Sequence, residues 1–265
     1  MNEAINKRKS VRKYSDQKLT QNQLNDIRNI ISNSNSLYED IDVDIDLMEG
    51  KKIWNSIKGI VGSYGKVEAP YYLIGSTEEK DGHLQNIGYI LEHIILKLTT
   101  KELATCWIGG RIQKKELKNK LKNNKNLNPR IIVALGHPKN KDDLHRKKEP
   151  KRKKLEELII NDQEPIEFEE ILSKARLAPS AMNSQPWRFQ VNQKEIDLYI
   201  KTKRGLVNRV LSKVGNLDSM NRIDAGIALK HIEIAAQDNY EKIRITKKSN
   251  KDKKNYEYIS TIEIS

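Results

Sequence analysis

Hydrophobic and polar positions alternate along the chain with the spacing of helices and strands in turn. Apolar residues recur at helical intervals over residues 20–31, and this spacing predicts an amphipathic helix. Thr20 is expected to cap that helix, with Gln23 completing a capping box. Strict alternation over residues 41–47 then predicts a half-buried strand.

Longer apolar runs predict the core of the N-terminal half. Residues 71–75 predict a buried strand, and residues 87–103 predict the longest helix of this half. Residues 131–136 are apolar at every position, which is typical of a central strand covered on both faces. Short helices are expected over residues 1–5, 51–60 and 114–121.

The C-terminal half shows a similar succession after a charged connector, residues 137–154. The pattern over residues 207–217 is ambiguous. Helices are predicted over residues 155–160, 168–178 and 222–239, a hairpin over 187–191 and 196–201, and strands around 243 and over 258–264.

Short sequence matches in the same order relate the two halves. Gly88-x-x-Leu91-x-His93-Ile94 recurs as Gly226-x-x-Leu229-x-His231-Ile232, and Lys7-Arg8-Lys9 recurs as Lys151-Arg152-Lys153. Residues 19–30 match residues 166–177, and the strand with Asp46-Leu47 matches the strand with Asp197-Leu198. Chance similarity between amphipathic segments is the alternative. A diverged duplication predicts an α+β fold of two similar halves, 1–145 and 146–265, packed as a pseudo-dimer with mixed, mainly antiparallel sheets flanked by helices.

Charge and cysteine content narrow the class of protein. The chain has 49 Lys and Arg against 36 Asp and Glu, a net charge of +13, so a nucleic acid or another polyanion is an alternative partner. The lysines are spread among Asn and Asp rather than grouped with aromatics, which favours a solvated surface and no nucleic-acid partner. The single cysteine, Cys106, excludes an internal disulfide and indicates a reducing compartment.

Membrane and secretion signals are not recognisable in the sequence. No apolar run approaches the roughly 20 residues of a membrane span, and the N-terminal residues lack the apolar core of a signal peptide. We therefore expect a cytoplasmic protein without a membrane partner.

Two short segments carry groups suited to a phosphorylated ligand. Arg8, Ser10 and Arg12 offer two guanidinium groups and a hydroxyl within a few residues, and guanidinium binds phosphate in a bidentate manner. A charged surface is the alternative. Gly109-Gly110 allows close approach of the backbone to a ligand, although a plain turn explains these residues equally well.

The loop from Pro179 to Trp187 is the most informative stretch of the second half. Asn183 and Gln185 each carry a donor and an acceptor, which suits a heteroaromatic ring, and two prolines stiffen the loop. No metal pattern, Gly-rich phosphate loop, nucleophile elbow or paired-carboxylate signature is present. The combination indicates a phosphorylated planar cofactor that itself carries the chemistry, with no catalytic side chain.

Several motifs together resemble the FMN-dependent nitroreductase family, in the subgroup with two fused nitroreductase-like halves. The resemblance covers nearly all of the 265 residues. It is carried by Ala175-Arg176-Leu177-Ala178-Pro179-Ser180-Ala181-Met182-Asn183-Ser184-Gln185-Pro186-Trp187-Arg188-Phe189, by Arg8-Lys9-Ser10-Val11-Arg12-Lys13-Tyr14, by Thr105-Cys106-Trp107-Ile108-Gly109-Gly110 and by Ala134-Leu135-Gly136-His137-Pro138.

The resemblance implies a set of FMN-binding residues. The FMN phosphate and ribityl chain would contact Arg8, Ser10 and Arg12, with Lys9 contributing its backbone. Arg152 would correspond to the phosphate-binding arginine that ordinary family members carry at the end of their chain. The flavin ring would contact the loop residues Pro179, Ser180, Ala181, Asn183 and Gln185, and the edge residues Ile108, Gly109 and Gly110. Each half has lost one set of these groups, which implies one site per chain.

By the same resemblance, NADH or NADPH would deliver hydride to the flavin in a ping-pong reaction. A nitroaromatic, a quinone or a similar small molecule would be the electron acceptor, and the protein would be a monomer or a weak homodimer. Alternatives within the resemblance are flavin reduction, reductive dehalogenation, flavin destruction and a flavin-binding protein without catalysis.

Overall fold

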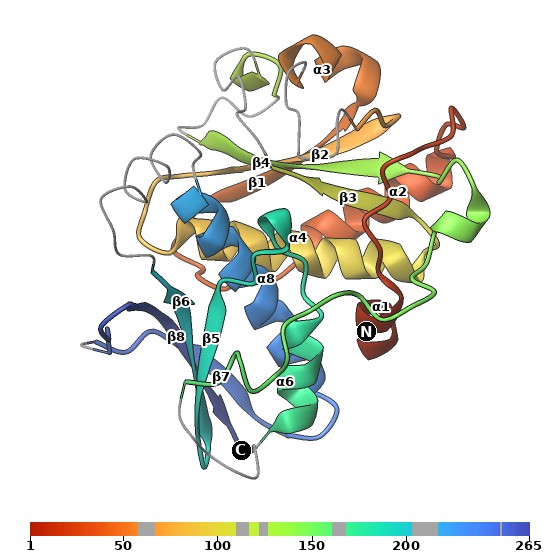
Figure 1. Cartoon of the computed structure of the whole chain (residues 1–265). Coiled ribbons are helices and arrows are strands. Elements are labelled where there is room, and N and C mark those ends of the chain that lie inside the picture. Colours follow the sequence, from red (N-terminus) through yellow and green to blue (C-terminus); the bar gives the residue numbers. More distant parts are fainter. Residues whose placement is uncertain (58–66, 110–116, 122–126, 161–167, 203–216, 250) are drawn as a thin grey trace. The chain divides into compact units, whose positions relative to one another are not determined.

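The chain divides into two compact units in the computed structural model (Figure 1). One unit comprises Met1 and Glu3–Glu149, and the other comprises Asn2 and Pro150–Ser265. The structure describes the chain except residues 58–66, 110–116, 122–126, 161–167, 203–216 and 250, and only the backbone of residues 54–57. Each unit contains one four-stranded sheet with helices packed on it.

The first sheet has the strand order β1-β2-β4-β3, with every neighbouring pair antiparallel. The strands are β1 (Val43–Glu49), β2 (Tyr71–Thr77), β3 (Ala104–Ile108) and β4 (Asn128–Gly136). The helices of this part of the chain are α1 (Asn2–Lys7), α2 (Gln21–Ser32), α3 (Gly50–Ile57) and α4 (His83–Thr100), followed by the 3₁₀ turn η1 (Lys141–Asp143).

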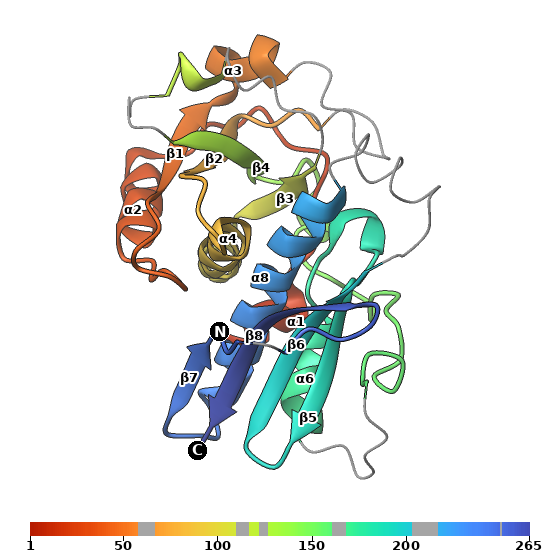
Figure 2. The ribbon, with the colours of Figure 1, turned by 90° about the vertical axis from the view of Figure 1, so that its left-hand side faces the viewer.

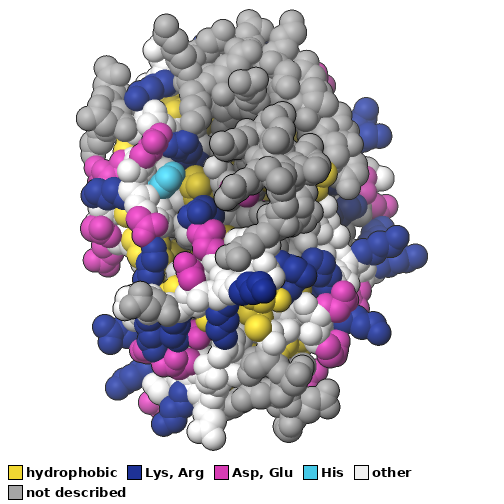
Figure 3. Space-filling view, turned by 60° about the vertical axis from the view of Figure 1, so that its left-hand side comes forward, with side chains coloured by type: hydrophobic (Ala, Val, Ile, Leu, Met, Phe, Trp, Pro, Cys, Tyr) yellow, Lys and Arg dark blue, Asp and Glu magenta, His cyan; other side chains and the backbone are white. Residues whose placement is uncertain are grey.

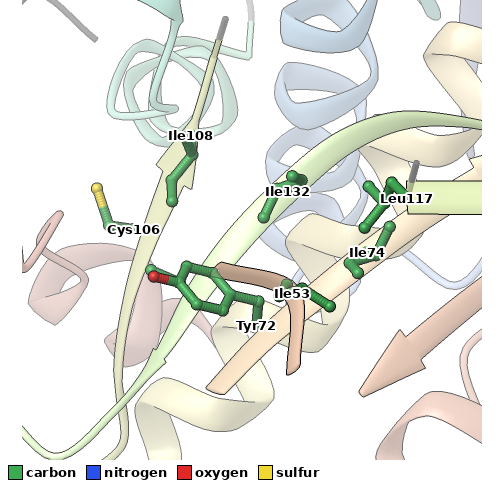
Figure 4. Close-up of a cluster of buried hydrophobic side chains, with 8 residues drawn as sticks. Ile53, Tyr72, Ile74, Cys106, Ile108, Leu117 and Ile132 are labelled. Atoms are coloured by element: carbon green, nitrogen blue, oxygen red, sulfur yellow. The ribbon is translucent and has the colours of Figure 1, made fainter. Parts of the chain in front are cut away.

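Helices cover both faces of the first sheet, and α3 and α4 lie on opposite sides of it (Figure 2). Every residue of β2 is buried, as expected for an inner strand between two layers. On the α3 side, side chains of β2, β3 and β4 form an apolar cluster with Ile53 and Leu117 (Figure 4). On the α4 side, a Cβ at Gly75 would lie 2.7 Å from Ile87 Cδ1, so this glycine permits the close approach of β2 and α4.

The second sheet has the order β5-β6-β8-β7, again with antiparallel neighbours. Helix α8 packs against α6, β5 and β6. The elements are α6 (Glu169–Arg176), the 3₁₀ turn η2 (Ala181–Asn183), β5 (Trp187–Asn192), β6 (Glu195–Lys201), α8 (Leu217–Ala236), β7 (Ile243–Thr246) and β8 (Tyr256–Ile264).

Apart from α1 and from α3, which lies between β1 and β2, the two units share one order of elements: a helix, two strands, a long helix and two strands. This order agrees with the duplication that the sequence predicts for α2 with α6 and for α4 with α8. The match of Asp46 with Asp197 is wrong, because Asp46 lies in the first strand of its sheet and Asp197 in the second. Amphipathic strands resemble one another too closely for a two-residue match to fix their order.

Several predicted helices differ from those in the structure; α8, for example, spans Leu217–Ala236 rather than 222–239. Residues 155–160 form a turn rather than a helix, and this turn pairs with β5, since Phe189 N donates to Leu158 O and Ile160 N donates to Phe189 O, both at 2.8 Å. Helix α4 ends at Thr100, before Glu102 in left-handed backbone at φ 58°. Residues 114–116 of the predicted helix 114–121 lie outside the described residues, and so do residues 207–216 of the ambiguous segment 207–217.

Candidate functional site

The segment that follows α1 is fixed against the edge of the first sheet. Ser10 forms a parallel bridge with Thr105 of β3, and Val11 N donates to Thr105 O at 3.0 Å. Further along, Ser15 N donates to His137 O at 3.0 Å. These backbone bonds hold residues 10–15 beside β3 and the end of β4 (Figure 1), so the sheet sets the positions of Ser10 and Arg12.

Arg8 is a buried cation with an unsatisfied hydrogen-bond donor. The residue is only 3% exposed, and burial lowers its pKa while Glu92 opposes that shift. Nη1 donates to Ser10 Oγ at 3.4 Å, and Nε lies 3.9 Å from Glu92 Oε1. Nε makes no hydrogen bond within the part of the chain that the structure describes. A buried unsatisfied guanidinium N–H is a group that an anionic oxygen would complete.

Lys9 and Arg12 are more exposed than Arg8. Arg12 Nη1 donates to the Ser10 carbonyl at 3.4 Å. Lys9 Nζ binds Asp143 Oδ1 at 2.7 Å, and this contact lowers the pKa of Asp143. The side chain of Lys9 is therefore already paired, which leaves its backbone for a ligand.

The end of β3 lies in the same unit as Arg8 and Ser10. Ile108 is buried and pairs with Ile132 of β4, and Gly109 follows it half-buried. Gly110, the third predicted residue of this turn, lies outside the described residues. Cys106 packs in the apolar cluster of Figure 4, where burial raises the pKa of its thiol, as expected for a structural cysteine.

The loop after α6 is strained and exposed at its tip. Met182, Asn183 and Gln185 have positive φ values of 54°, 55° and 49°, a left-handed backbone that residues other than glycine adopt at a cost. Met182 is 74% exposed. Strain of this kind persists only where the surroundings impose it, and it is concentrated at ligand sites.

Contacts from the connector hold this loop in its strained form. Arg152 Nη1 donates to Asn183 Oδ1 at 2.7 Å, and its Nη2 donates to Leu177 O at 3.3 Å. Lys153 N donates to Gln185 Oε1 at 2.7 Å. The structure thus brings together Arg152, Asn183 and Gln185, three of the residues that the sequence predicts for one site.

The two loop amides are occupied within their own unit. Asn183 Nδ2 donates to Lys151 O at 3.1 Å, and Gln185 Nε2 donates to Asn183 O at 3.1 Å. Inside the loop, Gln185 N donates to Ser180 Oγ at 3.0 Å. In this arrangement the amide side chains fix the backbone, so the exposed backbone and apolar groups of the loop are the parts open to a ligand.

Two buried carboxyl groups near these segments were not predicted from the sequence. Glu92 of α4 is 0% exposed and accepts from Trp107 Nε1 at 3.1 Å, besides facing Arg8. Asp224 of α8 is also buried and accepts from the amide of Ala181. A carboxylate within an otherwise apolar helix face is the sequence signal that could have identified both.

Two kinds of feature are absent from the described residues. No group of three or more His, Cys, Asp or Glu side chains there could hold a metal ion. No helix in the described part of the chain is both long and apolar enough to cross a membrane.

The comparisons with known proteins agree with the fold. Residues 1–236 match the protein family described as "Putative TM nitroreductase". A crystal structure described as a putative nitroreductase from Thermotoga maritima is similar at 22% identity with a TM-score of 0.64, covering 99% of this chain and 92% of that one. At this identity the likeness concerns the fold.

A more partial likeness links the chain to a smaller structure. The hypothetical oxidoreductase YcnD from Bacillus subtilis aligns at 17% identity with a TM-score of 0.47, over 64% of this chain and 76% of that chain. No curated protein matches the chain.

Proposed function

Because this chain belongs to the nitroreductase family that its residues 1–236 match, we propose that it is an FMN-dependent oxidoreductase. It takes hydride from NADH or NADPH and reduces a nitroaromatic, a quinone or a similar small acceptor in a ping-pong reaction. The bound flavin supplies the two-electron chemistry, and the protein supplies binding and orientation.

The observation that carries the proposal is the buried guanidinium of Arg8. Its Nε lacks a hydrogen-bond partner within the described residues, and the hydroxyl of Ser10 lies beside its Nη1. A phosphate oxygen would satisfy the free N–H and would add a charge-assisted bond in a site with little water. These residues therefore fit the phosphate of FMN, with Arg12 adding a second cation and Lys9 its backbone.

The remaining proposed contacts concern the flavin ring and a further phosphate-binding arginine. The amides of the turn at Ile108, Gly109 and Gly110 would stabilise negative charge on the reduced ring, because a fixed donor costs no reorganisation. The backbone of the loop that contains Pro179, Ser180 and Ala181 would support the ring. The same loop carries Asn183 and Gln185, and Arg152, bonded to Asn183, would act both on the loop and on the cofactor.

The absorption spectrum of the purified protein tests the proposal first. We expect a yellow protein with a flavin band, and we expect NADH or NADPH to bleach that band under anaerobic conditions. Parallel lines in double-reciprocal plots with a nitroaromatic or quinone would support the ping-pong order. A colourless protein that ignores added FMN contradicts the proposal, and a flavin band that neither nucleotide bleaches identifies a carrier without catalysis.

Substitutions test the phosphate contacts directly. Arg12→Ala should raise the Kd for FMN at least about tenfold, the effect of one charge-assisted hydrogen bond, as measured by quenching of flavin fluorescence. Arg8→Lys, which keeps the charge but removes the planar fork, should weaken binding as well. Arg28→Ala is the matched control, since Arg28 is an exposed arginine of α2 that contacts Asn25, and it should leave the Kd unchanged.

A further inference from the structure

A buried carboxyl group on α8 contacts the backbone of the loop in the proposed flavin site. Asp224 lies in α8 with 4% of its side chain exposed. Its Oδ1 and Oδ2 lie 3.2 and 3.0 Å from the backbone nitrogen of Ala181, the first residue of η2. Both oxygens therefore share one donor, and that donor belongs to the strained loop that contains Met182 and Asn183.

The duplicated unit shows what this position does in general. In the sequence alignment that matches Gly88 with Gly226, Asn86 of α4 is equivalent to Asp224 of α8. Asn86 is also buried, and its Oδ1 accepts from Leu37 N at 2.8 Å and from Tyr38 N at 3.1 Å. Its Nδ2 donates to Tyr38 O at 3.1 Å. In both units, this helix position holds the segment that follows the preceding helix.

The two units use different chemical groups for the same task. Asn86 is a neutral amide that both accepts and donates, whereas a carboxylate can only accept. Burial raises the pKa of Asp224 well above its ordinary value, and only the amide of Ala181 opposes this shift. Because desolvation disfavours the charged form, the neutral acid is the form that suits this position.

Charged side chains on the neighbouring elements are directed to other partners. On α8, Lys230 pairs with Glu233, and on α6, Arg176 donates to Lys153 O. On β5, Arg188 donates to Trp187 O, and on β6, Asp197 binds Lys251. No charged group adds to the pKa shift of Asp224, so neither a cation nor a second carboxylate is its cause.

We propose that Asp224 is a positioning residue which, as a neutral carboxylic acid, fixes the loop of residues 178–187 for the flavin through the amide of Ala181. This inference rests on the proposed function only in naming the ligand as a flavin. The contact between Asp224 and the loop does not depend on that function. Ionisation of Asp224 would require water at the carboxylate, and the loop would have to lift to admit it.

The sign of the pH effect follows from linkage. The carboxyl has a higher pKa when the loop is closed than when the loop is open and hydrated. The closed form is therefore most favoured below the open-state pKa, near 3.8, and is progressively lost as the pH rises toward the closed-state value. Asp224→Asn cannot ionise, so its loop should show no such pH dependence.

Amide hydrogen exchange of the full chain without added flavin tests the hold on the loop. Asp224→Ala should exchange the Ala181 amide about fivefold faster than the natural protein, the effect of one lost hydrogen bond. Asp224→Asn keeps an acceptor oxygen, so its Ala181 amide should exchange no faster than in the natural protein. As the pH is raised, the Ala181 amide of this variant should become increasingly better protected than that of the natural protein. Each comparison is made at one pH, so that intrinsic exchange rates cancel.

Asn86→Ala is the matched control, because it removes the equivalent residue of the first unit. It should speed exchange at Leu37 and Tyr38 and leave the Ala181 amide unchanged. Unchanged exchange at Ala181 in Asp224→Ala would overturn the hold on the loop. If Ala181 exchange in Asp224→Asn has the same pH profile as in the natural protein, the proposal that Asp224 is a neutral acid is overturned.

Titration with FMN separates this inference from the proposed function. We expect Asp224→Ala to raise the Kd for FMN about fivefold and Asp224→Asn to restore it. If the natural protein does not bind FMN but the exchange results hold, the proposed function fails while the hold on the loop stands. If FMN binds the natural protein and Asp224→Ala with equal Kd, the positioning role is overturned while the proposed function stands.

Discussion

Two buried carboxyl groups illustrate how single residues decide the chemistry of this protein. Glu92 faces the cation of Arg8 and the indole of Trp107, whereas Asp224 faces one backbone amide. A buried charge is tolerated when it is paired and hydrogen-bonded. Glu92 therefore has a cationic partner, whereas burial without such a partner raises the pKa of Asp224.

Removing the charge of Glu92 should destabilise the protein strongly. Glu92→Gln keeps an acceptor for Trp107 but leaves the Arg8 cation buried without its counter-charge, and we expect a loss of about 3 kcal/mol in the free energy of unfolding. Urea denaturation at neutral pH measures this loss.

The exposed pair of Lys7 with Glu3 provides the control for this measurement. Solvent-exposed ion pairs contribute little, so Glu3→Gln should change the stability far less than Glu92→Gln. Equal losses of unfolding free energy in the two variants would show that the buried ion pair contributes no more to stability than the exposed one.

Local sequence signals predict most helices and strands correctly. They fail where pairing with a segment distant in sequence determines the conformation. The capping box at the start of α2 is present as the sequence predicts, with Gln23 N donating to Thr20 Oγ1 and Thr20 N donating to Gln23 Oε1. Residues 155–160 have helical spacing but form a turn that pairs with β5. The tertiary partner here outweighs a weak local preference, as short apolar segments commonly show.

The cap of α2 should contribute measurably to stability. Thr20→Ala removes the hydroxyl that accepts from Gln23 N, and we expect a loss of about 1 kcal/mol in the free energy of unfolding. Thermal unfolding followed by circular dichroism measures it. Thr20→Ser keeps the hydroxyl and should retain nearly all of the stability; an equal loss in both variants would argue against capping as the cause.

The surface charge of the whole molecule fits a solvated exterior. The net charge is +13, but Figure 3 shows Lys and Arg interspersed with Asp and Glu over the described part of one face. Ion pairs such as Lys9 with Asp143 and Lys101 with Asp26 show the same intermixing. On this face, the described cations alternate with carboxylates rather than forming the one-sign patch typical of a polyanion-binding surface.

We predict one FMN for each chain. In the sequence, only the first half carries Arg8, Ser10 and Arg12, and only the second half carries the loop from Pro179 to Trp187. Native mass spectrometry measures the stoichiometry and the oligomeric state together. Two flavins per chain would show that each half binds independently, and affinity for nucleic acid that falls steeply with salt would favour a polyanion binder instead.

The sequence by itself determined most of the alternation of helices and strands, and it predicted a duplicated α+β unit and the segments that carry the candidate cofactor contacts. These features are local, since periodicity, capping and loop composition are written in neighbouring residues. The topology 1-2-4-3 that both sheets share required the structure, because strand order depends on pairing between distant segments.

Only the tertiary structure decided the roles of individual polar groups. Asn183 and Gln185 had the composition of ligand-binding amides, and their bonds to Arg152, Lys151 and Lys153 reveal a structural duty. Asp224 stands out in the sequence only as a carboxylate on an apolar helix face, and its bond to the amide of Ala181 became visible only in the structure. The physical reason is that the state of a polar group follows from burial and from partners distant in sequence, and neither can be known before the chain is folded.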